Sequence, residues 1–133
     1  IDNDQLLQAI KMSNLTDVIN KFSNNENTVV GDRGSKISDG QRQRIGIARA
    51  IYSNPDILIL DESLNALDYQ NEKIILENIA KNFNNRFILM VSHRIESLKY
   101  CNKLILIDNG KIKDFGERAE VIERNKNIQK YFE

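Results

Sequence analysis

Several features are scarce in this sequence, and each scarcity narrows what the protein can be. Its 133 residues contain one cysteine, Cys101, which excludes an internal disulfide and is typical of a reducing compartment. Lysine plus arginine number 19, equal to aspartate plus glutamate, so the net charge favours neither a nucleic acid nor an acidic membrane surface as partner. No apolar run approaches the roughly 20 residues that cross a bilayer, and residues 1–4 have no signal-peptide pattern. These features predict a soluble, cytoplasmic domain.

One stretch, residues 37–68, carries the strongest local signals, and it opens with a helix. Ser38 is expected to cap this helix, because its hydroxyl can accept from the free amides of the first turn. Asn54-Pro55 should end the helix, since the residue before a proline is pushed out of helical geometry. The helix is expected to place apolar side chains on one face and polar ones elsewhere. The apolar set is Ile45, Ala48 and Ile51, and the polar set is Gln41, Arg42 and Arg44.

After the helix comes an apolar run, Ile57–Leu60, which ends in Asp61-Glu62. A run without alternation predicts a strand that is covered on both faces, as in a parallel sheet flanked by helices. The two adjacent carboxylates follow its carboxyl end, which is where open α/β sheets bind their ligands. An ordinary strand end with two solvated acids is the alternative interpretation.

The rest of the chain is predicted to supply further helices and strands. Helices are expected at residues 4–12, 17–22, 72–83 and 95–100 and in the tail from 117, with strands at 87–91, 104–107 and 111–115 and a turn at 82–85. Asn109-Gly110 favours a type I′ hairpin turn, because both residue types tolerate positive φ. The expected buried positions are Ile75, Ile79 and Phe83 in one helix, and Val121, Ile122, Ile128, Tyr131 and Phe132 in the tail.

The stretch 37–68 resembles the ATP-binding cassette (ABC) domains, most closely those of ABC exporters. Residues 37–41, Ile-Ser-Asp-Gly-Gln, look like the signature motif LSGGQ. Residues 57–62 look like the Walker B strand with its catalytic glutamate, and residues 65–68, Asn-Ala-Leu-Asp, look like the D-loop SALD. The resemblance implies an α/β fold: part of a RecA-like P-loop NTPase core, with a parallel sheet and flanking helices, and part of a helical subdomain.

The resemblance also implies roles for single residues, with ATP and Mg²⁺ as cofactors. Asp61 would help to hold the magnesium of the nucleotide, and Glu62 would polarise the water that attacks the γ-phosphate. His93, the only histidine, stands where the family keeps a switch histidine, although a lone histidine after a strand is commonly structural. Asp68 would belong to the D-loop that links two sites across a dimer, and a helix cap is a compatible role.

The signature residues would act on a nucleotide held by a second cassette domain. Ser38 and Gly40 would contact its γ-phosphate, because the start of a helix favours an anion. Gln41 is the last residue of the motif. Asp39 departs from the pattern, since it replaces the first glycine with a carboxylate beside a triphosphate. Upstream, residues 28–34 are similar to an exporter loop that contacts the transmembrane domain, with the alternative of a simple turn that needs positive φ at two glycines.

One motif of the family is missing. A P-loop, G-x-x-x-x-G-K-[ST], is absent, because the only Gly-Lys pair is Gly110-Lys111 in the predicted hairpin. We therefore expect a fragment, with residues 1–54 in a partial helical subdomain and 55–133 in a partial catalytic core. Without the P-loop strand, the strands at 87–91 and 104–107 should lose a shared neighbour and leave edges and apolar faces open.

The favoured function is the ATP-hydrolysing subunit of an ABC exporter, coupled to a transmembrane domain at the cytoplasmic face of the cell (inner) membrane. The intact protein is expected to be an ATPase, and the fragment alone to bind ATP weakly or not at all. One alternative is an ABC-type ATPase outside transport, although such proteins usually carry long insertions or basic surfaces. Another is a non-catalytic interaction module that retains the motifs.

Overall fold

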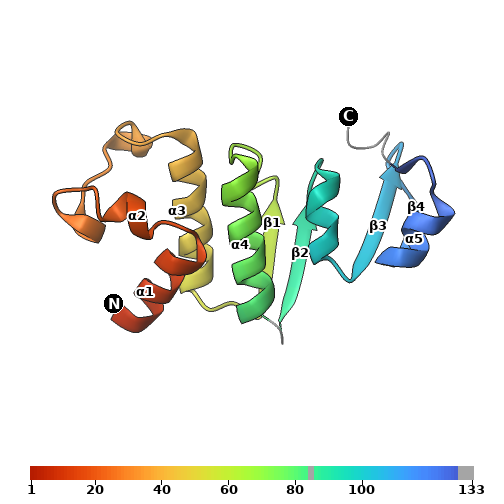
Figure 1. Cartoon of the computed structure of the whole chain (residues 1–133), viewed down its shortest axis with the longest axis horizontal. Helices are drawn as coiled ribbons and strands as arrows, with labels where there is room; N and C mark the ends of the chain where they lie inside the picture. The colour runs from red at the N-terminus through yellow and green to blue at the C-terminus, as the bar shows by residue number, and fades with distance from the viewer. Residues whose placement is uncertain (84–85, 129–133) are drawn as a thin grey trace. The chain divides into compact units, whose positions relative to one another are not determined.

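The computed structural model describes residues 1–83 and 86–128 (Figure 1). The chain forms two compact units, residues 1–91 and 92–133, and each is described by itself. The division at residue 54 into two partial domains therefore stays a prediction. The turn expected at 82–85 falls partly outside the described residues, and the predicted burial of Tyr131 and Phe132 falls wholly outside them.

Four α-helices lie in the first unit, and their starts are set by side-chain caps at three places. They are α1 (Asn3–Met12), α2 (Thr16–Ile19), α3 (Asp39–Tyr52) and α4 (Tyr69–Asn82). Asp2 caps α1 by accepting from the amides of Asp4 and Gln5. The helix predicted at 17–22 corresponds to α2, which is only one turn long. A 3₁₀ turn, Asn25–Asn27, lies in the loop beyond it. The other predicted helices of this unit are confirmed to within a few residues.

Two parallel strands form the sheet of the first unit, β1 (Ile57–Asp61) and β2 (Phe87–Val91). Ile57 lies opposite Phe87, and the pairing continues in register to Asp61 opposite Val91. The core of the unit combines one side of β1 with helix side chains: Ala9, Ile10, Met12, Leu15, Ile47, Ile51, Leu58, Leu60, Ile75, Leu76, Ile79 and Phe83. The burial predicted for Ile75, Ile79 and Phe83 is therefore confirmed.

The prediction that the strand at 57–60 is covered on both faces is wrong for the described residues. Leu58 and Leu60 are 2% exposed, but Ile57 is 58% and Ile59 60% exposed. The paired strand repeats this alternation, with Phe87 61% exposed. The physical reason is that the helices of this unit cover one face of the two-stranded sheet, while the apolar composition extends over both faces.

The buried face of α3 also differs from the prediction. Ile47 and Ile51 are its buried side chains, whereas Ile45 and Ala48 are only half-buried. Arg44, which was expected on a polar face, turns inward and is half-buried. It can do so because its guanidinium reaches hydrogen-bond acceptors beneath the helix, as described below.

In the described residues of the second unit, a β-hairpin packs against an α-helix and a 3₁₀ helix. The unit contains a 3₁₀ helix (Ile95–Tyr100), the antiparallel strands β3 (Lys103–Asp108) and β4 (Lys111–Glu117), and α5 (Arg118–Arg124). Asn109 and Gly110 have φ of 51° and 73°, which confirms the predicted type I′ turn. Leu104, Val121 and Ile128 form the buried centre of the unit, whereas Ile122 lies 38% exposed on the outer side of α5.

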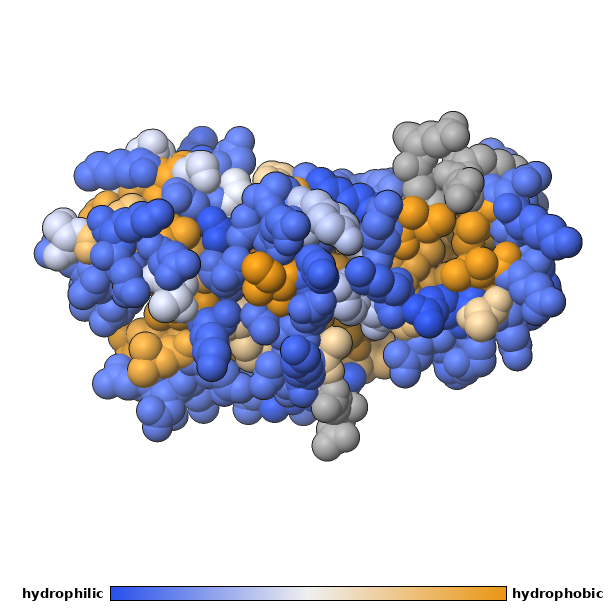
Figure 2. Space-filling view, viewed as in Figure 1, coloured by the Kyte–Doolittle hydropathy of each residue, from blue (hydrophilic) through white to orange (hydrophobic). Residues whose placement is uncertain are grey.

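The predicted loss of a shared neighbour between the strands at 87–91 and 104–107 stays a prediction, and each sheet is described by its own pairing. In the described residues, β2 pairs with β1 and β3 pairs with β4. The outer face of the hairpin is apolar as well, and Figure 2 shows hydrophobic side chains at the surface over β3. Its exposed apolar residues are Ile105, Ile107, Ile112 and Phe115. Each sheet therefore presents one open apolar face.

Candidate functional site

The start of α3 is fixed by a reciprocal pair of hydrogen bonds. Ser38 Oγ accepts from the amide of Gln41 at 3.2 Å, and Gln41 Oε1 accepts from the amide of Ser38 at 3.0 Å. This capping box confirms Ser38 as the N-cap. A helix leaves its first amides without intrahelical acceptors, so residues 39 and 40 can offer N–H groups to an anion.

The unusual carboxylate of this helix start is paired. Asp39 Oδ1 lies 3.0 Å from Nη1 of Arg42, one turn further along α3, and both side chains are largely exposed. Arg42 also donates to the carbonyl of Gly34 at 3.5 Å. The loop that ends there has positive φ at Gly31 (81°) and Gly34 (73°), as the alternative interpretation of a simple turn requires. The pair places a positive charge beside the added negative one.

At the end of β1, the chain turns sharply through Glu62. The φ of Glu62 is 48°, a left-handed conformation that is uncommon outside glycine and is found at turns and functional sites. Its amide still donates to Val91 of β2 at 3.2 Å. Asn65 Nδ2 donates to Glu62 Oε2 at 3.1 Å. Asp61 is exposed on the last position of the strand, so two carboxylates are presented at the carboxyl edge of the sheet.

The turn at residues 65–68 lies against the start of α3. The amide of Ala66 donates to Gln43 Oε1 at 2.9 Å. Gly40 faces the same residue so closely that a Cβ on it would lie 3.2 Å from the Ala66 carbonyl oxygen. Leu64 and Leu67 are buried beneath the turn. The structure thus brings the signature-like segment and the D-loop-like segment together within one unit.

Asp68 ends this turn and caps α4. It accepts from the amide of Asn71 at 3.0 Å and from Asn71 Nδ2 at 2.6 Å. These two hydrogen bonds hold the pKa of the Asp68 carboxyl below its ordinary value, and the bond from the Asn71 backbone amide contributes more than the one from its side chain. The predicted capping role of Asp68 is confirmed.

Asn71 connects that cap to two other elements. Its Oδ1 accepts from Asn14 Nδ2 at 2.8 Å and from Arg44 Nη1 at 3.2 Å. Arg44 Nη1 also donates to the Asn14 carbonyl at 2.6 Å. Burial lowers the pKa of the Arg44 guanidinium, and the nearby charge of Asp68 opposes this shift. A polar network therefore joins α3, α4 and the loop that follows α1.

Sequence reasoning missed four members of this arrangement: Asn14, Gln43, Arg44 and Asn71. The spacing Asp68-x-x-Asn71 is that of an N-cap and its third helical residue, so it could have suggested their contact. No local signal pointed to Asn14, which has φ of 54° and acts from far along the chain.

The remaining predicted site residue, His93, belongs to the second unit. It is exposed and directly follows β2. The adjacent Ser92 hydroxyl accepts from the amide of Arg94 at 3.0 Å, which shapes the turn around it. The site residues that the structure brings together are thus those of the first unit.

In residues 1–83 and 86–128, no group of three or more His, Cys, Asp or Glu side chains could hold a metal ion. Asp61 offers one exposed carboxylate. This donor set fits Mg²⁺ that is bound jointly with phosphate oxygens and water, because magnesium commonly takes one or two carboxylates and keeps several waters. It does not fit a cage made of protein ligands alone.

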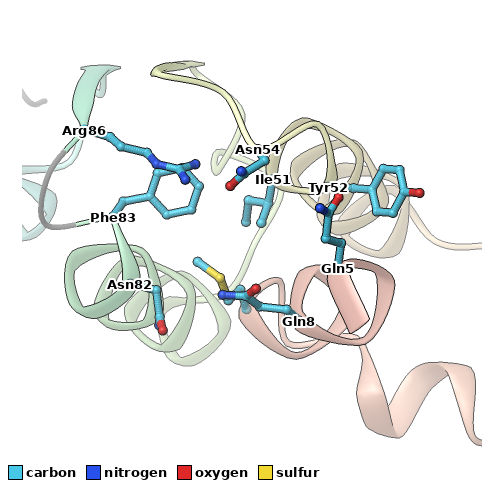
Figure 3. A pocket seen from close by; sticks show the side chains of 9 residues that line it. Gln5, Gln8, Ile51, Tyr52, Asn54, Asn82, Phe83 and Arg86 are labelled. Atoms are coloured by element: carbon cyan, nitrogen blue, oxygen red, sulfur yellow. The ribbon is translucent and has the colours of Figure 1, made fainter. Parts of the chain in front are cut away.

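A small pocket lies elsewhere, between α1, the end of α3 and the end of α4 (Figure 3). The Arg86 guanidinium lies 4.9 Å from the centroid of the Phe83 ring and donates to the Pro55 carbonyl at 3.1 Å. The pocket contains no predicted site residue. Arg86 thus joins the segment after α4 to the segment after α3, which is a structural role. Over the described part of the chain, no helix is long and apolar enough to span a membrane.

A strand that ends in two carboxylates, followed by a turn that is held against a capped helix start, is an arrangement suited to an anionic ligand in an α/β protein. A solved structure of a bacterial Atm1-family ABC exporter with ATP bound matches with a TM-score of 0.85 and 29% identity, over 93% of this chain and 22% of that chain. The ABC transporter family model matches residues 2–65.

Curated relatives match over nearly the whole chain. The alpha-hemolysin translocation ATP-binding protein HlyB of Escherichia coli O157:H7 is 38% identical over 98% of this chain and 19% of its own length. The leukotoxin export ATP-binding protein LtxB of Aggregatibacter actinomycetemcomitans is 40% identical over 96% of this chain and 18% of its own. The chain is therefore homologous over nearly its whole length to ABC exporter ATP-binding proteins, has the fold of a partial ABC cassette, and spans about a fifth of these relatives' length.

Proposed function

We propose that this chain is part of the ATP-hydrolysing subunit of an ABC exporter, in which ATP hydrolysis drives a substrate across a membrane. The observation that carries the proposal is the contact between the start of α3 and the turn at residues 65–68, beside the carboxylates that end β1. The similarity to proteins named for toxin export and translocation supports a transporter over an ABC-type ATPase with another task.

We propose distinct tasks for the two carboxylates. Glu62 would accept hydrogen bonds from the water that attacks the γ-phosphate, and Asn65 would hold that carboxylate in place. Asp61 would help to hold Mg²⁺, and the ion when bound would neutralise negative charge on the phosphates. His93 would donate an imidazole N–H to a phosphate oxygen.

The start of α3 would serve a nucleotide bound to a second cassette domain. Ser38 could donate its hydroxyl hydrogen to the γ-phosphate while its oxygen still caps the helix. The amide of Gly40 would donate to the same phosphate, and Gln41 would keep the helix start in shape through the capping box. Asp68 would face the second cassette domain, since it is exposed at the end of the turn.

The partners follow from this assignment. The second cassette domain would make a dimer with this one, and the partly exposed loop at residues 28–34 would contact the transmembrane domain. Val29 supports this contact, because it is an apolar side chain left 76% exposed in that loop. The whole protein would act at the cytoplasmic face of the cell (inner) membrane.

The proposed activity belongs to the whole protein. The chain contains no P-loop motif, which supplies the backbone cradle for the phosphates. We infer that the isolated 133-residue chain does not hydrolyse ATP and binds it more weakly than about 1 mM. Titration calorimetry of the isolated chain with ATP measures this affinity, and micromolar binding would overturn the inference.

The test of the function uses the full-length protein and its Glu62→Gln variant. We expect the wild type to hydrolyse ATP and the variant to bind ATP with hydrolysis reduced by about a hundredfold or more, because the attacking water loses its base. Glu123→Gln, at an exposed position of α5, is the matched control and should leave turnover unchanged. A wild type without ATPase activity would favour a non-catalytic module instead.

A further inference from the structure

The turn at residues 65–68 and the start of α3 are held together at two separate places. In Figure 1, α3 and α4 lie side by side and begin at the same end, where the turn leads from β1 into α4. The first tether is the hydrogen bond from the Ala66 amide to Gln43. The second runs from Asp68 through Asn71 to Arg44. Both tethers start from side chains of α3.

The first tether is local and close. Gln43 lies one turn beyond Gly40 on α3, so its side chain extends along the helix towards the turn. At Gly40 itself the helix touches the turn, since a Cβ there would approach the Ala66 carbonyl to 3.2 Å. One peptide group on each side of Ala66 is therefore in contact with α3. A side chain at residue 40 would press against the turn, and Gln43 resists a shift of the turn away from α3.

The second tether fixes the other end of the turn. Asp68 accepts two hydrogen bonds from Asn71. The side-chain oxygen of Asn71, Oδ1, in turn accepts from Arg44 and from Asn14. Arg44 is half-buried, so replacing it would leave acceptors beneath α3 unsatisfied. Because the same arginine donates to the Asn14 carbonyl, this tether also carries part of the stability of the unit. Gln43 is the better test position, because it makes one contact at an exposed backbone group.

We infer that Gln43 is a positioning residue that fixes the turn at residues 65–68 relative to the start of α3. The inference rests on the proposed function, in which Gly40 serves a nucleotide on a second cassette domain and Asp68 faces that domain. With Gln43 in place, the turn and the start of α3 move as one body. Closure of the dimer would then bring Gly40 and Asp68 to the second cassette domain together. Without Gln43, the Asp68 end of the turn stays tied to α3 through Asn71 and Arg44, but the Ala66 end can move away from Gly40.

The experiment compares Gln43→Leu with Gln43→Glu in the full-length protein. Leucine has a similar size but no acceptor, whereas glutamate keeps an oxygen that can accept from the Ala66 amide. We expect Gln43→Leu to lower kcat about tenfold with little change in the dissociation constant for ATP, because positioning and not binding is lost. Gln43→Glu should recover most of the turnover. Gln5→Leu, at an exposed position of α1, controls for loss of a glutamine amide.

Hydrogen exchange at residues 64–68 provides a readout that does not require activity. The Ala66 amide should exchange at least tenfold faster in Gln43→Leu than in wild type, and at the wild-type rate in Gln43→Glu. Unchanged exchange, or turnover within twofold of wild type in Gln43→Leu, would overturn the inference while leaving the ATPase assignment intact. If Gln43→Leu exchanges faster than wild type but the wild type hydrolyses no ATP, the proposed function is overturned. The role of Gln43 in catalysis then falls with it.

Discussion

The carboxylate of Asp39 is paired with the guanidinium of Arg42 across one turn of α3, at 3.0 Å. The pair matters because Asp39 occupies a position where the LSGGQ pattern has glycine, next to the amides that would meet a phosphate. An unpaired carboxylate at that place would repel the nucleotide. We therefore expect the nearby arginine to compensate for the departure of this sequence from the LSGGQ pattern.

This pairing predicts how substitutions change nucleotide affinity. In the full-length protein, Arg42→Gln should raise the KM for ATP by about two- to fivefold, because an exposed ion pair of this kind is weak and screened by salt. The double variant Asp39→Gly/Arg42→Gln should return KM to the wild-type value. Arg49→Gln, near the exposed end of the same helix, is the control.

Steady-state kinetics at low and high salt would test whether Arg42 compensates for the charge of Asp39. The effect of Arg42→Gln should shrink as salt is added, since the repulsion is electrostatic. If the double variant were no better than Arg42→Gln alone, the arginine would serve the nucleotide directly, and compensation of Asp39 would be the wrong explanation.

Ser38 should show two separable contributions. Ser38→Ala should lower the free energy of unfolding by about 1 kcal/mol, because the capping hydrogen bond to the Gln41 amide is lost. Ser38→Asn should restore that stability, since asparagine caps helices as well as serine does. ATPase activity should remain low in both variants, because both lack the hydroxyl.

Urea unfolding and ATPase assays of the same two variants test these contributions. Recovery of stability without activity in Ser38→Asn is the expected pattern. Recovery of both would mean that the hydroxyl acts only as a helix cap, and the proposed contact between Ser38 and the γ-phosphate would have to be abandoned.

The second unit should carry an acid-sensitive contact. Hydrogen bonds from Arg124, with a smaller contribution from Asn125, lower the pKa of the Asp114 carboxyl from 3.8 to about 2. Because the folded-state pKa is depressed, the stabilisation is fully present above pH 4 and is lost as the pH falls towards 2. Asp114→Asn should therefore lower stability at neutral pH and flatten the pH dependence of stability between 4 and 2.

Thermal unfolding followed by circular dichroism between pH 2 and 7 measures this effect. Glu123→Gln, on the exposed side of α5, is the control for removal of one acidic group. Parallel pH profiles for wild type and Asp114→Asn would show that the bond between β4 and α5 contributes nothing that titrates in this range.

Local patterns predicted the fold well where the cause was local. The strand at Phe87–Val91 was placed at its observed bounds, the Asn109-Gly110 turn has the expected positive φ, and Ser38 caps α3. Each depends on the chemistry of a few neighbouring residues. The prediction of burial on both faces of β1 was wrong, because apolar composition does not tell which part of a protein covers a surface.

The candidate site, which stays a proposal, could be assembled from the sequence only in part. The motif residues Asp61, Glu62 and Asp68 are recognised by their order along the chain. Gln43 and Asn71 could not be recognised in this way, because their importance comes from contacts between elements that are far apart in sequence. Pattern analysis assigned Arg44 to the polar side of α3, although long side chains can bury their stems and still satisfy their charged ends.

The two sheets also differ in how far apart their paired residues lie along the chain. In β3 and β4, pairing begins at neighbours of a two-residue turn, Asp108 with Lys111, and extends outward from it. In β1 and β2, the first pair joins Ile57 to Phe87, thirty positions apart, with all of α4 in between. Closing a long loop costs more entropy and takes longer than closing a short one. The hairpin should therefore form early during folding, whereas the parallel pair that carries the carboxylates should form only after α4 has organised.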